Sequence, residues 1–264
     1  DGSAIGVVEE SASELLPVGS TVRHRLGWRE YAVVDDATAT ICDLTKAPTL
    51  SWLSSMGQTG FTAYAGLLPV GKLATGETVL VTGAGGAVGS MVGQFARLMG
   101  AGRVIGSAGG AAKCDWLKEE CGFDEVINYR DQDFAQELPK FAPDGIDLFF
   151  DNVGGWQFAA ALHNMKLRGR ISMCGAVSNF GTQEQPSTAV LIETVLRRLT
   201  ITGFIVRDYE DLRPEFEARV SDWLAQGQLV DRATIVEGIA AAGAGLEGLL
   251  SGANFGKALV RLSD

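Results

Sequence analysis

The stretch of residues 79–93 constrains the fold of this chain more than any other segment. Its sequence, VLVTGAGGAVGSMVG, starts with a short apolar run, continues as a glycine-rich turn and ends in apolar residues at helical spacing. A strand, a tight glycine turn and a helix N-terminus in this order form a cradle for a pyrophosphate, because the backbone can approach the ligand closely and the helix dipole attracts anions. Ala84 stands where the usual pattern has its first glycine, and a purely structural turn is the alternative explanation. The strand before the turn and the helix after it favour a dinucleotide site.

The residues after the next predicted strand indicate which dinucleotide binds. An NAD-binding chain carries an Asp or Glu about 20 residues after the glycines, where it holds the ribose 2′-hydroxyl. Here the strand at residues 103–106 is followed by SAGG at residues 107–110, which contains no carboxylate to repel a 2′-phosphate. Lys113 lies one turn into the next helix, within reach of that phosphate, although most helix lysines are simply solvated. The sequence therefore predicts NADPH as the cofactor.

Charge and composition exclude several classes of partner. The 264 residues include 22 basic and 32 acidic side chains, and the net charge of −10 argues against nucleic acid or an anionic membrane. No apolar run reaches the roughly 18 residues that span a bilayer. The four cysteines form no C-x-x-C pair and there are only two histidines, so we expect no zinc site and, with free thiols, a cytoplasmic protein. Because the chain runs from Asp1 directly into an apolar segment, we expect an N-terminal portion to be missing.

The order of the apolar segments predicts an α/β fold with a doubly wound, six-stranded parallel (Rossmann) sheet. Residues 1–52 are interpreted as short β segments, among them strands at 6–9 and 28–34. The strands of the predicted sheet are residues 79–82, 103–106, 125–128, 146–150, 170–174 and 200–206, and the helices between them are residues 87–100, 111–121, 132–138, 156–166 and 189–199. A helix at 211–226, a helical stretch at 235–250 and a strand at 257–262 complete the prediction.

Motifs along nearly the whole chain point to a known family. They are GFTAYAGLL at residues 60–68, the glycine segment, AGGAAKC at 108–114, DNVGG at 151–155, CGAVS at 174–178, GFIV at 203–206 and NFGK at 254–257. In this order and at these intervals, the sequence resembles the zinc-free branch of the medium-chain dehydrogenase/reductases. That branch contains the leukotriene 12-hydroxydehydrogenase/prostaglandin reductases, plant double-bond reductases and bacterial curcumin reductase.

The resemblance implies which residues hold the cofactor. Gly86, Ala87, Val88 and Gly89 would lie under the pyrophosphate, Gly109, Lys113 and Tyr129 at the phosphorylated ribose, and Asn152 at a ribose or the bridging phosphate. Cys174, Gly175, Ser178, Phe180, Phe204, Ile205 and Val206 would line the nicotinamide, and Asn254 would reach the cofactor from the C-terminal segment. Without the resemblance, Asn152 is a turn residue, Phe204 and Val206 are strand core, and Asn254 is an exposed loop residue.

The resemblance also divides the chain into domains. It implies part of a GroES-like catalytic domain at residues 1–52, an NADP-binding Rossmann domain at 53–229 and a return to the catalytic domain at 230–264. Members of the family carry a further stretch in front, including a tyrosine near the substrate carbonyl, so the GroES-like part is incomplete here. Phe180 replaces a second tyrosine of the family, and Gln58-Thr59 replaces a Met-Pro pair. Because members are commonly dimers, a homodimer is the assembly to test.

The activity implied is reduction of a carbon–carbon double bond conjugated to a carbonyl group, in a small α,β-unsaturated carbonyl compound. Hydride would move from NADPH to the β-carbon while negative charge builds on the carbonyl oxygen. We assign no catalytic side chain and no metal, since the cofactor supplies the chemistry and the protein mainly orients it. Two alternatives stay open, a quinone reductase of the same superfamily and a protein that binds NADPH without turnover.

Overall fold

The computed structural model describes residues 2–176 and 190–262 of the chain. The chain forms two compact units: a terminal unit, Asp1–Thr59 with Glu217–Asp264, and a central unit, Gly60–Phe216. The predicted domains at 1–52, 53–229 and 230–264 stay a prediction. Within the described ranges, none of the helices combines the length and the apolar character needed to cross a membrane.

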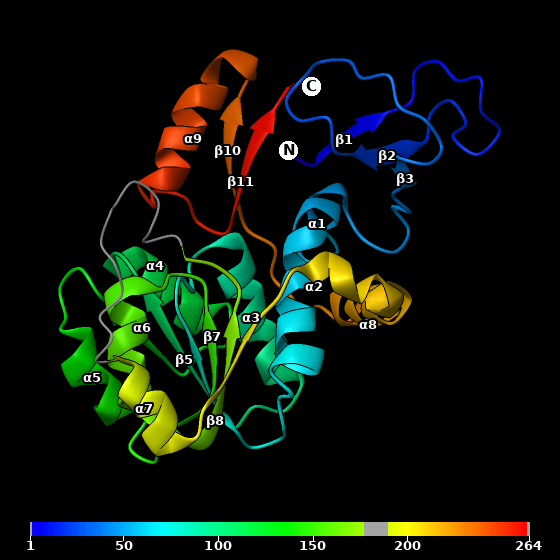
Figure 1. The fold of residues 1–264 in the computed structure, drawn as a ribbon. Coiled ribbons are helices and arrows are strands. Elements are labelled where there is room, and N and C mark those ends of the chain that lie inside the picture. The colour runs from blue at the N-terminus through cyan, green and yellow to red at the C-terminus, as the bar shows by residue number, and fades with distance from the viewer. Residues whose placement is uncertain (1, 177–189, 263–264) are drawn as a thin grey trace. The chain divides into compact units, whose positions relative to one another are not determined.

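The central unit is an alternation of strands and helices (Figure 1). In chain order its elements are α2 (Gln58–Ala65, which begins in the terminal unit), the π-helical turn η1 (Gly66–Val70), β4 (Thr78–Val81), α3 (Ala87–Leu98), β5 (Arg103–Ala108), α4 (Ala111–Glu119), β6 (Glu125–Asn128), α5 (Phe134–Phe141), β7 (Ile146–Asp151), α6 (Gly155–Leu162), β8 (Met165–Met173), α7 (Val190–Arg197), β9 (Thr200–Gly203) and the short helix η3 (Val206–Leu212).

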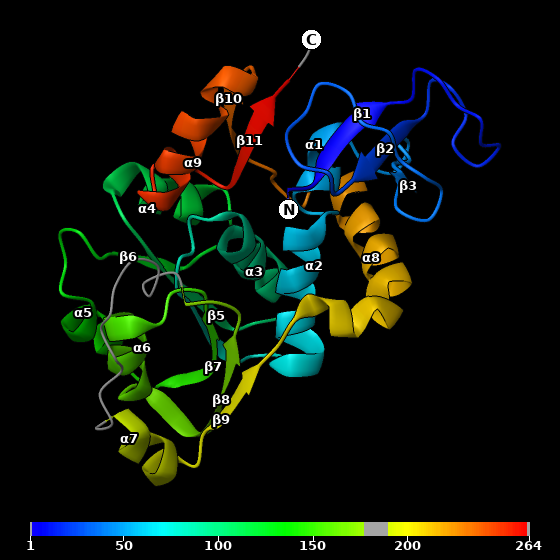
Figure 2. The ribbon, with the colours of Figure 1, turned by 45° about the horizontal axis from the view of Figure 1, so that its top comes forward.

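The six strands form one sheet in the order β6-β5-β4-β7-β8-β9, and every neighbouring pair is parallel. This is the predicted doubly wound sheet, and the prediction is confirmed. The strand order reverses between β4 and β7, and β9 is the outer strand beside β8 (Figure 2). In such folds ligands bind outside the carboxyl ends of the strands at this reversal. We therefore expect the ligand site at the loops after β4, β5 and β7.

Helices pack on both faces of the sheet, with α3 on the side opposite α5 and α6 (Figure 1). On the α5–α6 face, side chains from five strands and the two helices form one buried core: Leu80, Ile105, Ile127, Phe134, Leu138, Ala142, Ile146, Phe149, Ala161, Leu162, Met165 and Ile171. Helix α5 begins where it does because the Asp133 carboxylate accepts hydrogen bonds from the backbone N–H groups of Ala135 and Gln136, which caps the helix.

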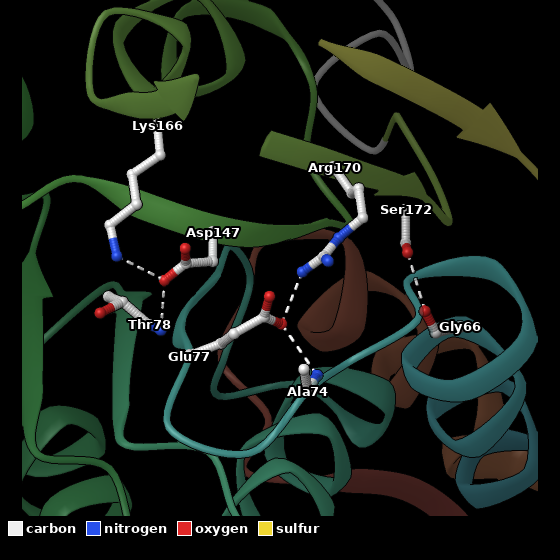
Figure 3. A network of polar contacts seen from close by, with 8 residues as sticks. All are labelled: Gly66, Ala74, Glu77, Thr78, Asp147, Lys166, Arg170 and Ser172. Carbon is white, nitrogen blue, oxygen red and sulfur yellow. Dashed lines mark hydrogen bonds and ion pairs between the residues drawn. The ribbon is translucent and has the colours of Figure 1, made fainter. Parts of the chain in front are cut away.

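Ion pairs hold the amino ends of three strands together (Figure 3). Lys166, the second residue of β8, donates from Nζ to Asp147 Oδ2 at 2.7 Å, and the same oxygen accepts the backbone N–H of Thr78 at 2.9 Å. Arg170 of β8 donates from Nη2 to Glu77 Oε2 at 2.5 Å. All four charged side chains are only partly exposed, so these bonds are less screened than surface pairs. The amino edge of the sheet is therefore fixed by paired charges.

The terminal unit contains two small sheets. Its elements are β1 (Ala4–Val7), β2 (Thr21–His24), β3 (Thr40–Ile41), α1 (Thr49–Leu53), α8 (Arg213–Ala225, which begins in the central unit), β10 (Ala233–Glu237), the short helix η4 (Ile239–Ala241), α9 (Ala242–Leu250) and β11 (Lys257–Arg261). Strands β1, β2 and β3 form an antiparallel sheet, and β10 pairs with β11 in parallel. The carboxylate of Asp231, just before β10, joins this segment to the region of α1 that follows β3 by accepting hydrogen bonds from the hydroxyls of Ser51 and Ser55.

Two predictions in the terminal unit are wrong. Residues 28–34 form no strand, and the third strand is Thr40–Ile41 instead. The side chains of Tyr31 and Val33 are 76% and 97% exposed, so the alternation of apolar residues there meets no partner strand. The predicted helical stretch 235–250 starts as β10, because its backbone pairs with β11, and becomes helical only after Gly238, whose φ of +80° ends the strand.

Two predicted boundaries in the central unit are also corrected. The helix predicted at 156–166 ends at Leu162, and β8 begins at Met165, which pairs with Ile146. The strand predicted at 200–206 ends at Gly203, and Val206 begins η3. Phe204 and Val206 are therefore not strand residues. In both places the apolar pattern continues across a change of backbone conformation, which composition alone does not reveal.

Candidate functional site

The glycine-rich turn lies between β4 and α3, at the carboxyl edge of the sheet. Gly86 is the residue before the helix, and no side chain caps the N-terminus, so the backbone there presents donors without a side-chain acceptor. A Cβ on Gly89 would lie 2.4 Å from the carbonyl oxygen of Gly83, whereas a Cβ on Gly86 would meet nothing closer than 3.4 Å. Gly89 is thus required for the close packing of helix on turn, and Gly86 leaves open space above it. Ala87 and Val88 form the first turn of α3, as the sequence predicts.

The turn after β5 is held by the side chain of Asn128, the last residue of β6. Its Oδ1 accepts hydrogen bonds from the backbone N–H of Gly110 at 2.8 Å and of Arg130 at 3.3 Å. Its Nδ2 donates to the carboxylate of Asp131 at 2.5 Å. Gly110 has a φ of +100°, a conformation that suits only glycine well, so the turn before α4 depends on this residue. One amide therefore joins the carboxyl ends of β5 and β6.

Lys113 lies across the glycine-rich turn. Its side chain is 8% exposed, and its Cδ would lie 2.1 Å from a Cβ on Gly85. Burial lowers the pKa of the Lys113 ammonium, and the nearby guanidinium of Arg130 lowers that pKa further, while the thiol of Cys114 opposes the shift. The fold thus holds two basic side chains close together at this edge of the sheet.

Tyr129 and one of these two basic side chains, Arg130, lie against Gly109. A Cβ on Gly109 would lie 2.8 Å from Tyr129 Oη and 2.9 Å from Arg130 Nε. We call Gly109, Lys113, Tyr129 and Arg130 the basic cluster. It unites three predicted site residues with Arg130, which the sequence places nearby but does not assign to the site. Arg130 is near both Lys113 and Gly109, so the cluster gathers a hydroxyl and two basic groups, a concentrated set of donors for an anionic group.

The turn after β7 is built on a buried carboxylate. Asp151 is fully buried, and its Oδ1 accepts hydrogen bonds from Thr82 Oγ1 at 2.5 Å and from the backbone N–H groups of Val153 and Gly154 at 3.0 and 3.1 Å. Burial raises the pKa of the Asp151 carboxyl, and these hydrogen bonds oppose that shift. Asn152 donates from Nδ2 to the carbonyl of Thr82 at 2.8 Å. The ends of β4 and β7 are therefore fixed to each other, with Asn152 between them.

The residues after β8 continue this arrangement. The backbone N–H groups of Cys174 and Gly175 donate to the carbonyl of Asp151 at 2.9 and 3.2 Å, and a Cβ on Gly175 would lie 3.1 Å from the carbonyl of Asn152. Burial, with Asp151 nearby, raises the pKa of the Cys174 thiol to about 12, so this thiol stays protonated at neutral pH. The predicted residues Ser178 and Phe180 lie outside the described residues.

The three predicted residues after β9 have different environments. The ring of Phe204 packs edge-on against Phe150 of β7, with centroids 6.2 Å apart, and against Tyr209 at 6.4 Å. Ile205 is 65% exposed, and Val206 is buried at the start of η3. Phe204 and Val206 thus support the fold, and Ile205 presents its side chain outward. Their contact with a nicotinamide stays a prediction.

Asn254 belongs to the terminal unit. It is 7% exposed, and its Nδ2 donates to the carbonyl of Gly256 at 2.9 Å, in the loop before β11. It is therefore a buried loop residue and not an exposed one. Its predicted role toward the cofactor stays a prediction.

Three features of this edge were not predicted from the sequence. They are the Asn128 hydrogen bonds that join the ends of β5 and β6, the Thr82–Asp151 hydrogen bond and the place of Arg130 in the basic cluster. All lie at the ends of predicted strands, which was the signal that could have found them. In residues 2–176 and 190–262, no group of three or more His, Cys, Asp or Glu side chains is arranged to hold a metal ion.

Comparison with known proteins extends this description. Residues 87–226 match the family described as zinc-binding dehydrogenase. The chain is 38% identical to the NADP(+)-dependent 2-alkenal reductase of Nicotiana tabacum, covering 99% of this chain and 77% of the relative. It is 37% identical to the NADPH-dependent curcumin reductase of Escherichia coli, again over 99% and 77%. The crystal structure of CurA from Vibrio vulnificus in complex with NADPH superposes with a TM-score of 0.91 at 38% identity, covering all of this chain and 80% of that one.

Proposed function

The chain belongs to the zinc-binding dehydrogenase family, the medium-chain dehydrogenase/reductases, and from that premise we propose that it is an NADPH-dependent reductase of conjugated carbon–carbon double bonds. Its substrates would be small α,β-unsaturated carbonyl compounds. The observation that carries the proposal is the basic cluster beside the glycine-rich turn, because the turn suits the pyrophosphate of this cofactor and the cluster suits its 2′-phosphate.

The residues present fit NADPH in three places. The turn at Gly86 and the uncapped start of α3 provide backbone donors and open space for the pyrophosphate. The basic cluster provides two cations and the Tyr129 hydroxyl for the 2′-phosphate. Asn152 uses its Nδ2 to bond Thr82, so its amide oxygen is the atom that would accept a ribose hydroxyl.

The protein's own contribution would be orientation of the cofactor. The Asp151 hydrogen bonds fix the backbone of the turn after β7, and the backbone of Cys174 and Gly175 is bonded to the same turn. These segments would form a rigid wall for the nicotinamide, with Cys174 as a neutral, unreactive side chain. When bound, NADPH supplies a hydride to the substrate β-carbon, and the α-carbon takes up a proton. We propose that the reaction needs no zinc.

Purified protein tests the proposal directly. NADPH oxidation is followed with a 2-alkenal, a cyclic enone and a quinone, and the products are identified by mass spectrometry. We expect the saturated carbonyl compound, with deuterium at the β-carbon when the transferable hydrogen of NADPH is deuterium. Turnover of the quinone alone would favour the quinone-reductase alternative. Tight NADPH binding without oxidation in the presence of any of the three acceptors would contradict the proposed activity and favour a binding protein.

A further inference from the structure

Two exposed aromatic rings meet beside the basic cluster. Tyr129, directly after β6, is 36% exposed, and Trp156, the second residue of α6, is 54% exposed. Their ring centroids are 6.3 Å apart with an interplanar angle of 75°, an edge-to-face contact. Trp156 also packs edge-on against the buried ring of Phe134, with centroids 5.7 Å apart. Neither neighbour stacks face to face on the indole, and more than half of Trp156 is exposed, so indole surface remains accessible to another flat group.

The contact with Phe134 does not by itself account for a tryptophan at this position. More than half of the Trp156 surface stays in water, so little of the free energy available from burying an indole is gained. A large exposed aromatic side chain at a sheet edge that binds ligands is instead typical of a recognition surface.

The two aromatic rings lie close to the basic cluster, where an adenosine held by its 2′-phosphate would be bound. The Tyr129 hydroxyl lies 2.8 Å from the Cβ position of Gly109, and the Tyr129 ring contacts Trp156. In an adenosine 2′-phosphate the base is attached to C1′, the carbon next to the one that carries the phosphate. A 2′-phosphate held by Lys113, Tyr129 and Arg130 therefore brings the purine within reach of the two rings.

We propose that Trp156, together with Tyr129, forms the stacking wall for the adenine base of the cofactor. The inference rests on the proposed function, because it takes the basic cluster as the site of the 2′-phosphate. It assigns to Trp156 a recognition role in addition to its packing on Phe134. A π-face on the protein binds a purine by stacking and requires no hydrogen bond to the base.

The test uses adenosine 2′,5′-bisphosphate, which contains the adenine and the 2′-phosphate but no nicotinamide and so does not absorb tryptophan emission. We expect it to quench the fluorescence of the wild-type protein and of Trp223→Phe, a control that removes a different indole. In Trp156→Phe, which keeps an aromatic ring on Phe134, most of the quenching should disappear. In Trp156→Leu, the Kd for the bisphosphate should rise about tenfold, the equivalent of about 1.4 kcal/mol.

Binding of reduced nicotinamide mononucleotide distinguishes a role of Trp156 in adenine recognition from a role in packing on Phe134. This mononucleotide lacks the adenosine, so its Kd should be the same in the wild type and in Trp156→Leu. The inference is overturned if Trp156→Leu binds the bisphosphate as tightly as the wild type does, or if its affinity for both halves of the cofactor falls together with its melting temperature. Failure of the wild type to bind either the bisphosphate or NADPH would instead overturn the proposed function.

Discussion

Replacing Lys113 by methionine isolates one charge in the proposed cofactor site. Methionine keeps an unbranched chain, so the packing of the Lys113 Cγ and Cδ atoms against the turn at Gly85 is largely retained. Burial lowers the pKa of Lys113, which means that the folded protein disfavours its charge. The melting temperature of Lys113→Met should therefore equal or exceed that of the wild type, while its affinity for NADPH falls.

The expected loss of NADPH affinity can be estimated from the electrostatics of a partly desolvated contact between Lys113 and the 2′-phosphate. A hydrogen bond to a charged group contributes about 1.5–3 kcal/mol, and two unit charges about 4 Å apart at an effective dielectric constant of about 20 attract by about 4 kcal/mol. Arg130 and Tyr129 remain in the variant and retain part of the interaction. We therefore expect a loss of about 2 kcal/mol, which raises the Kd for NADPH about 30-fold. The Kd for NADH, which has no 2′-phosphate, should change less than about twofold.

Calorimetric titration with both coenzymes measures this difference. The matched control is Lys118→Met, on the same helix α4, whose Nζ lies 3.2 Å from Glu125 Oε2 and whose side chain is 45% exposed. Because a surface pair of this kind contributes at most about 1 kcal/mol, the control should bind NADPH like the wild type. Equal losses for NADPH and NADH in Lys113→Met, or equal losses in the two variants, would refute the assignment of the 2′-phosphate to the basic cluster.

Three further predictions concern the same edge of the sheet. The NADPH affinity of the wild type should decrease as the pH rises through the pKa of Lys113, because the ammonium loses its charge there. This pKa lies below the ordinary 10.5, and titrations of Lys113→Met should lack the alkaline decrease. Gly86→Ala should have the melting temperature of the wild type but bind NADPH at least about tenfold more weakly, because the added Cβ has room in the protein but not beneath a pyrophosphate. Gly89→Ala should instead lose about 1–3 kcal/mol of stability, because its Cβ would lie 2.4 Å from the carbonyl oxygen of Gly83. Cys174, with a pKa of about 12, should react with iodoacetamide at least about tenfold more slowly than an ordinary thiol, because its smaller thiolate fraction outweighs the higher nucleophilicity of that thiolate; mass spectrometry of the native protein measures the rate.

The sequence predicted the central unit well because its signals are local. Each strand there is a short apolar run followed by a turn and a helix, and the parallel order of the strands follows from that alternation. The terminal unit was predicted less well because its strands depend on partners far away in the chain. Ala233–Glu237 forms a strand by pairing with Lys257–Arg261, whereas residues 28–34 pair with no strand in the part of the chain that the structure describes.

The candidate site could be predicted in outline but not in detail. The positions of Gly109, Lys113 and Tyr129 follow from strand ends that meet at one edge of a parallel sheet, and the structure brings them together. The direction of a side chain does not follow from such positions. Arg130 enters the basic cluster because Asn128 shapes the turn before it, and Phe204 packs on Phe150 because β9 ends a few residues early.

The two edges of the sheet differ in how the surroundings act on their basic side chains, and this difference bears on the proposed anionic ligand. At the amino edge, Lys166 and Arg170 each contact a carboxylate, so the charges neutralise each other within the fold. At the carboxyl edge, Lys113 is held next to Arg130, and both burial and this neighbour oppose its charge. An arrangement that disfavours a charge in the free protein becomes favourable when a bound anion replaces the lost solvation, and the binding free energy then adds to the stability of the fold. This balance is consistent with the proposal that the basic cluster binds a phosphate.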